Sequence, residues 1–192
     1  MDFFKKIFSS KSKTYDSLKE SHPEDKTAQM TDDELFVFNF IKNGGQFFYP
    51  EDMDEFKTEL LKLLTHLDIP YYNVLERSYY HFLNKLHIPA EFGFSKQGIL
   101  LGGCESLIAT EGAIMTTEKH TSNYRNTDLP HKRVIVALSS QITSTKNQAL
   151  SNINKKYETP PANIQTMSIF APPTDALQSG NWYEVYLFLI EN

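Results

Sequence analysis

Residues 104–142 read CESLIATEGAIMTTEKHTSNYRNTDLPHKRVIVALSSQI and contain the pattern that decides the fold. Two short apolar runs, 106–110 and 113–117, flank Gly112, and a polar segment then leads into the run RVIVAL at 133–138. A continuous, β-branched apolar run of this kind is typical of a strand that is buried on both faces, as in a parallel sheet. The stretch therefore predicts a strand, a glycine turn, a second strand, a polar loop and a central buried strand.

The segments on either side alternate between helix and strand patterns. Thr31 and Glu34 have the spacing of a capping box, and Gly44-Gly45 is a good helix stop. The apolar run 35–41 between them could also be a strand, but the cap favours a helix. A second helix follows Pro50, because apolar residues recur there every three or four positions up to residue 67. Further helices are expected at 75–86 and 144–156, and further strands at 46–49, 71–75, 98–101, 164–170 and 182–190.

This alternation predicts an α/β domain with a mostly parallel, twisted sheet and helices on both faces. A chain of 192 residues fits one such domain. Residues 9–30 are polar and rich in Lys, Ser, Glu and Asp, so we expect residues 1–30 to form an N-terminal arm or linker and residues 31–192 to form the domain.

The first residues, MDFFKKIFSSKSK, combine a short apolar face with four lysines. They lack the apolar core and cleavage site of a signal peptide and are too short to span a bilayer. The segment could pack on its own domain, touch a membrane surface or bind a partner. No longer hydrophobic stretch predicts a transmembrane segment.

Charge and cysteine content exclude several classes of function. The formal charge is −5, and no Lys/Arg stripe marks a nucleic-acid interface. The single cysteine, Cys104, cannot form an internal disulfide or supply a Cys-rich zinc or iron–sulfur site from this chain alone. The cytoplasm is therefore the expected compartment.

Loops that leave buried strands are where α/β domains place their ligand sites. The backbone amides at Gly102, Gly103 and Gly112 could approach an anion closely, or these glycines could simply form tight turns. The side chains of Arg125, Lys132 and Arg133 could clamp a carboxylate, or they could be solvated at the surface.

Three further candidates involve single side chains or pairs. Glu105 and Glu111 would share one face of an unbroken strand and could form an acid–base pair, although a solvated edge also explains them. His120 and His131 flank the polar loop at a spacing that matches no known metal motif, so no metal site is expected. Cys104 precedes an acidic residue that would raise its pKa, which favours a buried spectator thiol.

No P-loop, dinucleotide-binding glycine motif, nucleophile elbow or zinc-protease motif is present, so no cofactor is expected.

The central stretch resembles the LUD domain, the lactate-utilisation family with LutC-type subunits. The turn 109–113 (ATEGA) is similar to the family's A-[DE]-T-G-[ST] turn. Arg125, then residues 128–131 (DLPH) and 134–136 (VIV), are similar to its arginine, LLP and H-(I/V)-V-V series, and Gln141-Ile142 follow where the family has an isoleucine-rich step.

The resemblance implies a fold akin to the NagB/RpiA/CoA transferase group. It also implies a role in oxidising L-lactate to pyruvate beside partner subunits that carry iron–sulfur clusters. If the chain is instead an enzyme that uses this loop cluster, Glu111 is the candidate catalytic residue, as base or nucleophile. The candidate ligand-binding residues are Thr110, Gly112, Arg125, His131, Arg133, Thr174 and Asp175.

The chain also departs from the family pattern. Thr110 and Glu111 are exchanged relative to the usual order, and Ala113 replaces a hydroxyl residue. Residues 171–175 (APPTD) are a shortened form of the family's G-P-S-x-T-x-D-I-E segment, and its G-x-H-G-P turn does not follow. A ligand that relatives hold with that loop would bind weakly here.

Three hypotheses follow from the sequence. The first is an accessory subunit of a lactate-utilisation system that has no redox centre of its own. The second is a protein that binds a small carboxylate or phosphate ligand, or a transferase- or isomerase-like enzyme that uses the same loops. The third is a scaffold that has the fold but has lost the pocket. Whether the chain is catalytic stays open.

Overall fold

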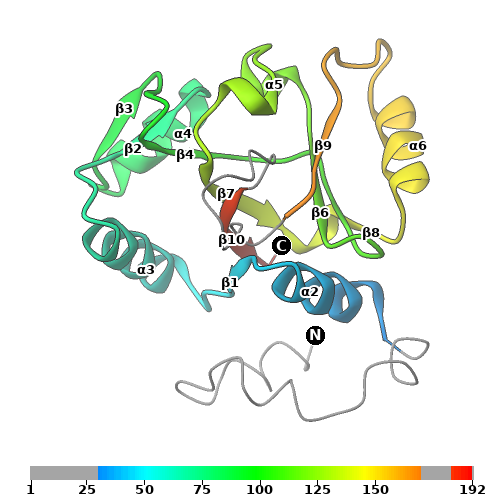
Figure 1. The fold of residues 1–192 in the computed structure, drawn as a ribbon, viewed down its shortest axis with the longest axis horizontal. Coiled ribbons are helices and arrows are strands. Elements are labelled where there is room, and N and C mark those ends of the chain that lie inside the picture. The colour runs from blue at the N-terminus through cyan, green and yellow to red at the C-terminus, as the bar shows by residue number, and fades with distance from the viewer. Residues whose placement is uncertain (1–29, 170–182, 192) are drawn as a thin grey trace, which may run out of the picture.

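The computed structural model describes residues 30–169 and 183–191. A six-stranded, wholly parallel sheet forms its centre, in the order β1-β10-β7-β4-β2-β3 (Figure 1). Its strands are β1 (Gln46–Phe48), β2 (Tyr72–Val74), β3 (Ala90–Phe92), β4 (Ile99–Gly102), β7 (Lys132–Leu138) and β10 (Glu184–Ile190). The run RVIVAL lies in β7, between β10 and β4, which confirms that it is a central buried strand.

A smaller sheet lies beside the first, in the order β8-β5-β6-β9. Its strands are β5 (Ser106–Ile108), β6 (Ala113–Thr116), β8 (Ile142–Thr143) and β9 (Gln165–Met167). The antiparallel pair β5–β6 is the predicted strand–turn–strand corner, and Gly112 in its turn has a φ of +57°. This left-handed conformation is one that glycine adopts readily.

The helices begin and end close to their predicted positions: α2 (Asp32–Lys42), α3 (Met53–His66), α4 (Arg77–Lys85) and α6 (Lys146–Lys156). The predicted capping box is present at the start of α2, where Thr31 and Glu34 satisfy each other's backbone amides. Asp52 caps α3 in a similar way. A fifth, short helix, α5 (Glu118–Thr121), lies in the loop between β6 and β7.

Alternate side chains of β7 enter two different cores. Val134 and Val136 pack in one cluster with α3 and α4, whereas Ile135 and Ala137 pack in another with α2 and the smaller sheet. A third cluster joins α6 to the other face of β5 and β6. Helices therefore cover both faces of the parallel sheet, and the predicted α/β class is confirmed.

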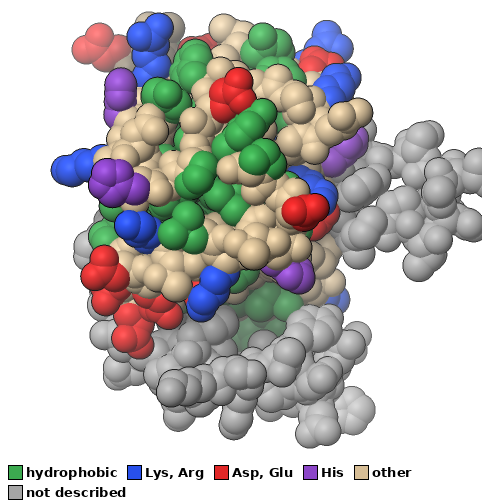
Figure 2. All heavy atoms as spheres, turned by 90° about the vertical axis from the view of Figure 1, so that its left-hand side faces the viewer, with side chains coloured by type: hydrophobic (Ala, Val, Ile, Leu, Met, Phe, Trp, Pro, Cys, Tyr) green, Lys and Arg blue, Asp and Glu red, His purple; other side chains and the backbone are tan. Residues whose placement is uncertain are grey.

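Strand β3 ends the large sheet on the side opposite to β1. Hydrophobic side chains gather on that face of the molecule, with most charged groups towards its periphery (Figure 2). Phe92, the last residue of β3, has the largest exposed fraction among the large hydrophobic residues of the described chain, at 50%. The sequence patterns predicted neither β3 nor α5, because three or four residues are too few to show a period.

The expected arm lies almost wholly outside the described residues, so the boundary at residue 31 stays a prediction. Within residues 30–169 and 183–191, no helix combines the length and apolar character that a membrane span requires.

Candidate functional site

The strand order places a ligand crevice at one edge of the large sheet. From β2 the chain moves outward to β3, whereas from β4 it moves the other way, through β7 to β10. The direction of winding thus reverses between β2 and β4. In open parallel sheets, ligands bind outside the carboxyl ends of the strands at such a point. The carboxyl ends of β4 and β7 meet at this edge because the two strands are parallel neighbours.

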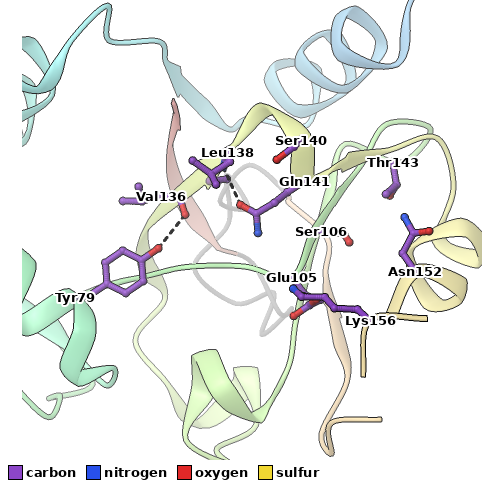
Figure 3. A pocket seen from close by; sticks show the side chains of 11 residues that line it. Tyr79, Glu105, Ser106, Val136, Leu138, Ser140, Gln141, Thr143, Asn152 and Lys156 are labelled. Carbon is purple, nitrogen blue, oxygen red and sulfur yellow. Dashed lines mark hydrogen bonds and ion pairs between the residues drawn. The ribbon is translucent and has the colours of Figure 1, made fainter. Parts of the chain in front are cut away.

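A pocket of about 570 Å³ opens at this same end of the sheet, beside the point of reversal, between β7, α4, α6 and the start of β5 (Figure 3). Most of its lining residues carry a polar group, and the end of β7 contributes an apolar wall. The lining residues are Tyr79, Glu105, Ser106, Val136, Ala137, Leu138, Ser140, Gln141, Thr143, Asn152 and Lys156.

The charged residues that line the pocket are Glu105 and Lys156. The Glu105 side chain is only 5% exposed, and its Oε1 lies 2.8 Å from Lys156 Nζ. The Tyr157 hydroxyl donates to the other carboxylate oxygen at 3.1 Å. The hydrogen bond to Glu105 raises the pKa of Lys156, so the ammonium stays charged. The pocket therefore holds a buried carboxylate and a cation that is 59% exposed at the mouth.

The Gln141 side chain connects two backbone segments that border the pocket. Its Oε1 accepts from the Leu138 amide at 2.8 Å, and its Nε2 donates to the Cys104 carbonyl at 2.5 Å. One side chain thus joins the end of β7 to the link between β4 and β5. This bond network fixes the backbone beside Glu105.

The side chains of Glu76 and Tyr79 lie close to Gly103, just beyond the end of β4. The Glu76 carboxylate accepts from the Gly103 amide at 3.2 Å, and burial raises the pKa of this carboxyl above its ordinary value. The Tyr79 hydroxyl donates to the Val136 carbonyl at 3.3 Å and would lie 2.8 Å from a Cβ at position 103. Only glycine fits at this position without displacing Tyr79.

His120 approaches the same glycine from α5. Its Nδ1 accepts a hydrogen bond from the Thr117 amide at 3.1 Å, which assigns the proton of the neutral ring to Nε2. Burial lowers the pKa of His120, and the nearby Glu105 opposes this shift. The ring is therefore a neutral hydrogen-bond donor beside the carboxyl edge of the sheet.

Cys104 is buried, and burial together with Glu105 raises the pKa of its thiol. It packs in the core with α2 and β5. This arrangement agrees with the predicted spectator role, because a protonated, enclosed thiol is a poor nucleophile.

The predicted site residues around Gly112 lie away from the pocket, against α2. Asn39 donates to the carbonyls of Ala109 and Thr110, at 2.8 and 3.3 Å, and Asn43 donates to that of Glu111. The amides of Thr110 and Gly112 already donate to carbonyls of the chain. Thr110 and Glu111 are exposed. The turn thus anchors the hairpin to α2, and its role in ligand binding or catalysis stays a prediction.

The predicted basic residues lie near the amino end of β7, at the opposite edge of the sheet. Arg125 is exposed. The ring centres of His131 and Tyr183 are 6.2 Å apart. Arg133 is buried and donates to the carbonyls of Pro130 and Asn126. None of these side chains lines the pocket. Thr174 and Asp175 lie outside the described residues.

In the structure, the two glutamates of the suggested acid–base pair lie apart, and so do the two histidines that flank the polar loop. Glu105 and Glu111 lie beyond opposite ends of β5, which is too short to present both on one face. His120 and His131 lie at opposite edges of the sheet. Among the described residues, no group of three or more His, Cys, Asp or Glu side chains could hold a metal ion.

Sequence reasoning considered Glu105 but did not predict its partners Lys156 and Tyr157. These residues are about fifty positions away and reach Glu105 only because α6 packs against β5. The available signal was a carboxylate that follows directly after a short apolar strand and two glycines.

No protein-family model and no curated protein sequence matches the chain. Among solved structures, it is similar to the crystal structure of a DUF162 family protein from Deinococcus radiodurans. That match has a TM-score of 0.59 and 11% sequence identity, and it covers 85% of this chain and 99% of the other. DUF162 is the LUD domain family. At this identity the likeness shows the fold alone, and the chain is a distant structural match to that family.

Proposed function

We propose that the pocket at the carboxyl edge binds a small hydroxycarboxylate. The observation that carries this proposal is the buried Glu105 carboxylate beside the exposed Lys156 ammonium. Lys156 binds the ligand carboxylate, because an ammonium group has three donors and Glu105 uses one of them. Glu105 accepts a hydrogen bond from the ligand hydroxyl, since a carboxylate has about four acceptor positions.

The neutral side chains of the pocket suit such a ligand. Ser106, Gln141 and Asn152 offer donors and acceptors on three sides, and the apolar end of β7 faces the carbon atoms. A pocket with a few convergent polar groups and an apolar wall is the usual form of a small-molecule site. The volume of about 570 Å³ accommodates a small hydroxycarboxylate together with solvent at the mouth.

We also propose that the chain acts as an accessory subunit in the oxidation of L-lactate to pyruvate in the cytoplasm. The LUD-like motifs and the structural likeness to a DUF162 protein support this role. In this role the electrons are accepted by partner subunits that carry iron–sulfur clusters, and the single cysteine of this chain leaves such clusters to the partners.

Calorimetric titration with L-lactate, propionate and acetate tests the pocket. L-Lactate should bind, and propionate, which lacks the hydroxyl, should bind about tenfold more weakly or worse. Lys156→Gln should abolish binding. Lys155→Gln is the matched control, since it removes an exposed lysine from the same helix outside the pocket. Equal titration curves for both lysine variants would rule out the proposed site.

Affinity purification of the full chain from its native cell tests the subunit role. Iron–sulfur or flavin proteins should copurify, and deletion of the gene should slow growth on lactate. Normal growth together with no redox partner would refute the subunit role but leave ligand binding intact.

A further inference from the structure

A second polar cluster lies under the loop between α5 and β7, near the amino end of β7. Its centre is Arg133, which is only 3% exposed. The guanidinium donates to two main-chain carbonyls, those of Pro130 and Asn126, and lies 5.5 Å from the Tyr183 ring centre. Burial lowers the pKa of Arg133 to about 10. At neutral pH the group is therefore a buried cation.

This cation has no acidic partner in the part of the chain that the structure describes. The ion pairs found there involve Lys62, Lys132 and Lys156. A buried charge is normally paired, because removing it from water costs several kcal/mol. Two neutral carbonyls compensate this cost only in part.

Two unpartnered oxygens lie in the same neighbourhood. Within residues 30–169 and 183–191, the buried side-chain atoms without a hydrogen bond are Thr116 Oγ1 and Asn126 Oδ1. Thr116 is 3% exposed and Asn126 is 6% exposed. Buried polar side chains almost always have a partner, so each of these two oxygens needs an explanation.

Hydrogen bonds connect Gln165 and Asn126 to Arg133, and strand pairing places Thr116 beside Gln165. Thr116 lies directly opposite Gln165 in the antiparallel pair β6–β9, so both side chains point to the same face. Gln165 Oε1 accepts from the Asn126 amide at 2.9 Å, and the Asn126 carbonyl accepts from Arg133 Nη2 at 2.9 Å. The residues that carry the two unpartnered oxygens are therefore neighbours of the buried cation, Asn126 through its backbone hydrogen bonds and Thr116 through its pairing with Gln165.

We propose that Arg133, Asn126 and Thr116 form an internal site for a small oxyanion that also carries an O–H group. The anion supplies the missing negative charge to the guanidinium, which has donors in a planar fork. Its O–H group donates to Asn126 Oδ1. The Thr116 hydroxyl can donate to the anion or accept from it. Hydrogen phosphate and 2-hydroxycarboxylates share this chemistry, whereas sulfate and simple carboxylates lack the O–H group.

The site is separate from the pocket of the proposed function. Arg133 pairs with Leu100 in the sheet, before the end of β4, whereas Glu105 and Lys156 lie beyond that end. Binding at one site can therefore be lost without the other.

Thermal unfolding of the full chain with four probes tests the proposal: inorganic phosphate, sulfate, glycolate and acetate. The informative variant is Asn126→Asp, which keeps the side-chain shape and supplies an internal counter-charge to Arg133. Asn154→Asp, on the exposed face of α6, is the control with the same change in net charge.

In the wild type and in Asn154→Asp, phosphate and glycolate should raise the Tm more than sulfate and acetate do, as binding to the native state requires. Asn126→Asp should unfold at the same or a higher temperature without ligand, and its affinity for phosphate should fall about tenfold or more. Comparison with the control at equal anion concentration cancels the general effect of salt on stability.

Equal Tm shifts for all four anions, or a phosphate response in Asn126→Asp that matches the control, would overturn the proposal. No response to any probe would also overturn it and would leave water as the partner of these atoms. Lys156→Gln should retain the phosphate response, so failure of this site is distinguishable from failure of the pocket.

Discussion

Glu105 and Lys156 form an ion pair of 2.8 Å in which the carboxylate is buried and the ammonium is largely exposed. Loss of Lys156 and loss of Glu105 should therefore affect the stability of the fold differently. Removing the lysine leaves a charge in the protein interior, whereas neutralising the glutamate leaves only a solvated cation.

Lys156→Gln is expected to lower the free energy of unfolding by about 1–2 kcal/mol, less than a fully enclosed pair would lose, because water already screens the lysine. Glu105→Gln should cost less, since its amide can still accept from Tyr157. Urea denaturation of both single variants and the double variant measures this asymmetry. A double variant less stable than Lys156→Gln alone would contradict the explanation.

Gly112→Ala is expected to destabilise the fold by about 3 kcal/mol or more, because overpacking adds to an unfavourable backbone conformation. A Cβ there would lie 2.5 Å from backbone atoms of Asn39 and Phe40. Gly93→Ala is the control for the backbone contribution: its φ of +115° is at least as unfavourable for alanine, but a Cβ there would meet nothing within 4 Å. Chemical denaturation should show a clearly larger loss at position 112, and equal losses would argue against close packing of the turn on α2.

The pH dependence of stability should contain two opposite contributions near Gly103. Burial puts the folded pKa of His120 below its ordinary 6.5, so the unfolded chain binds more protons just below pH 6.5. The free energy of unfolding then falls as the pH drops through that window. Burial puts the folded pKa of Glu76 above its ordinary 4.5, so its contribution falls as the pH rises above 4.5.

Two variants separate these contributions. His120→Gln should flatten the loss of stability below pH 6.5, and Glu76→Gln should flatten the loss that begins above pH 4.5. The measurement is urea unfolding at a series of pH values from 4 to 7.5. Identical pH profiles for the wild type and both variants would show that neither group is held away from its ordinary pKa.

Cys104 should react slowly with a thiol reagent such as dithionitrobenzoate in the native protein and at once in urea. The reason is that its thiol is buried and burial raises its pKa. Rapid modification of the native protein without loss of structure would mean that the link between β4 and β5 opens to solvent.

Much of the fold could be predicted because its strong signals are local. The capping box at Thr31, the leucine periodicity of α3 and the run RVIVAL each depend on neighbouring residues, and each element forms where it was predicted. Strand β3 escaped prediction because its three residues, Ala90–Phe92, have no distinct pattern and pair only through β2.

The candidate site was harder to predict because tertiary packing creates it. The sequence leaves open whether Arg133 is solvated or binds a ligand, and only the fold shows that it is buried and donates to the carbonyls of Pro130 and Asn126. Lys156 belongs to a polar surface helix by its pattern, and only the packing of α6 beside β5 brings it to Glu105. Single-residue chemistry is visible in a sequence, but the distances between residues far apart in the chain are not.

Strand β10 pairs with β1 on one side and β7 on the other, although β1 ends at Phe48 and β10 begins at Glu184. During synthesis on the ribosome, about 135 residues must follow β1 before its neighbour in the sheet exists. Until then β1 and β7 both present unpaired backbone groups, and such edges promote aggregation. Yield in the cell should thus depend on chaperones that shield these strands while translation continues.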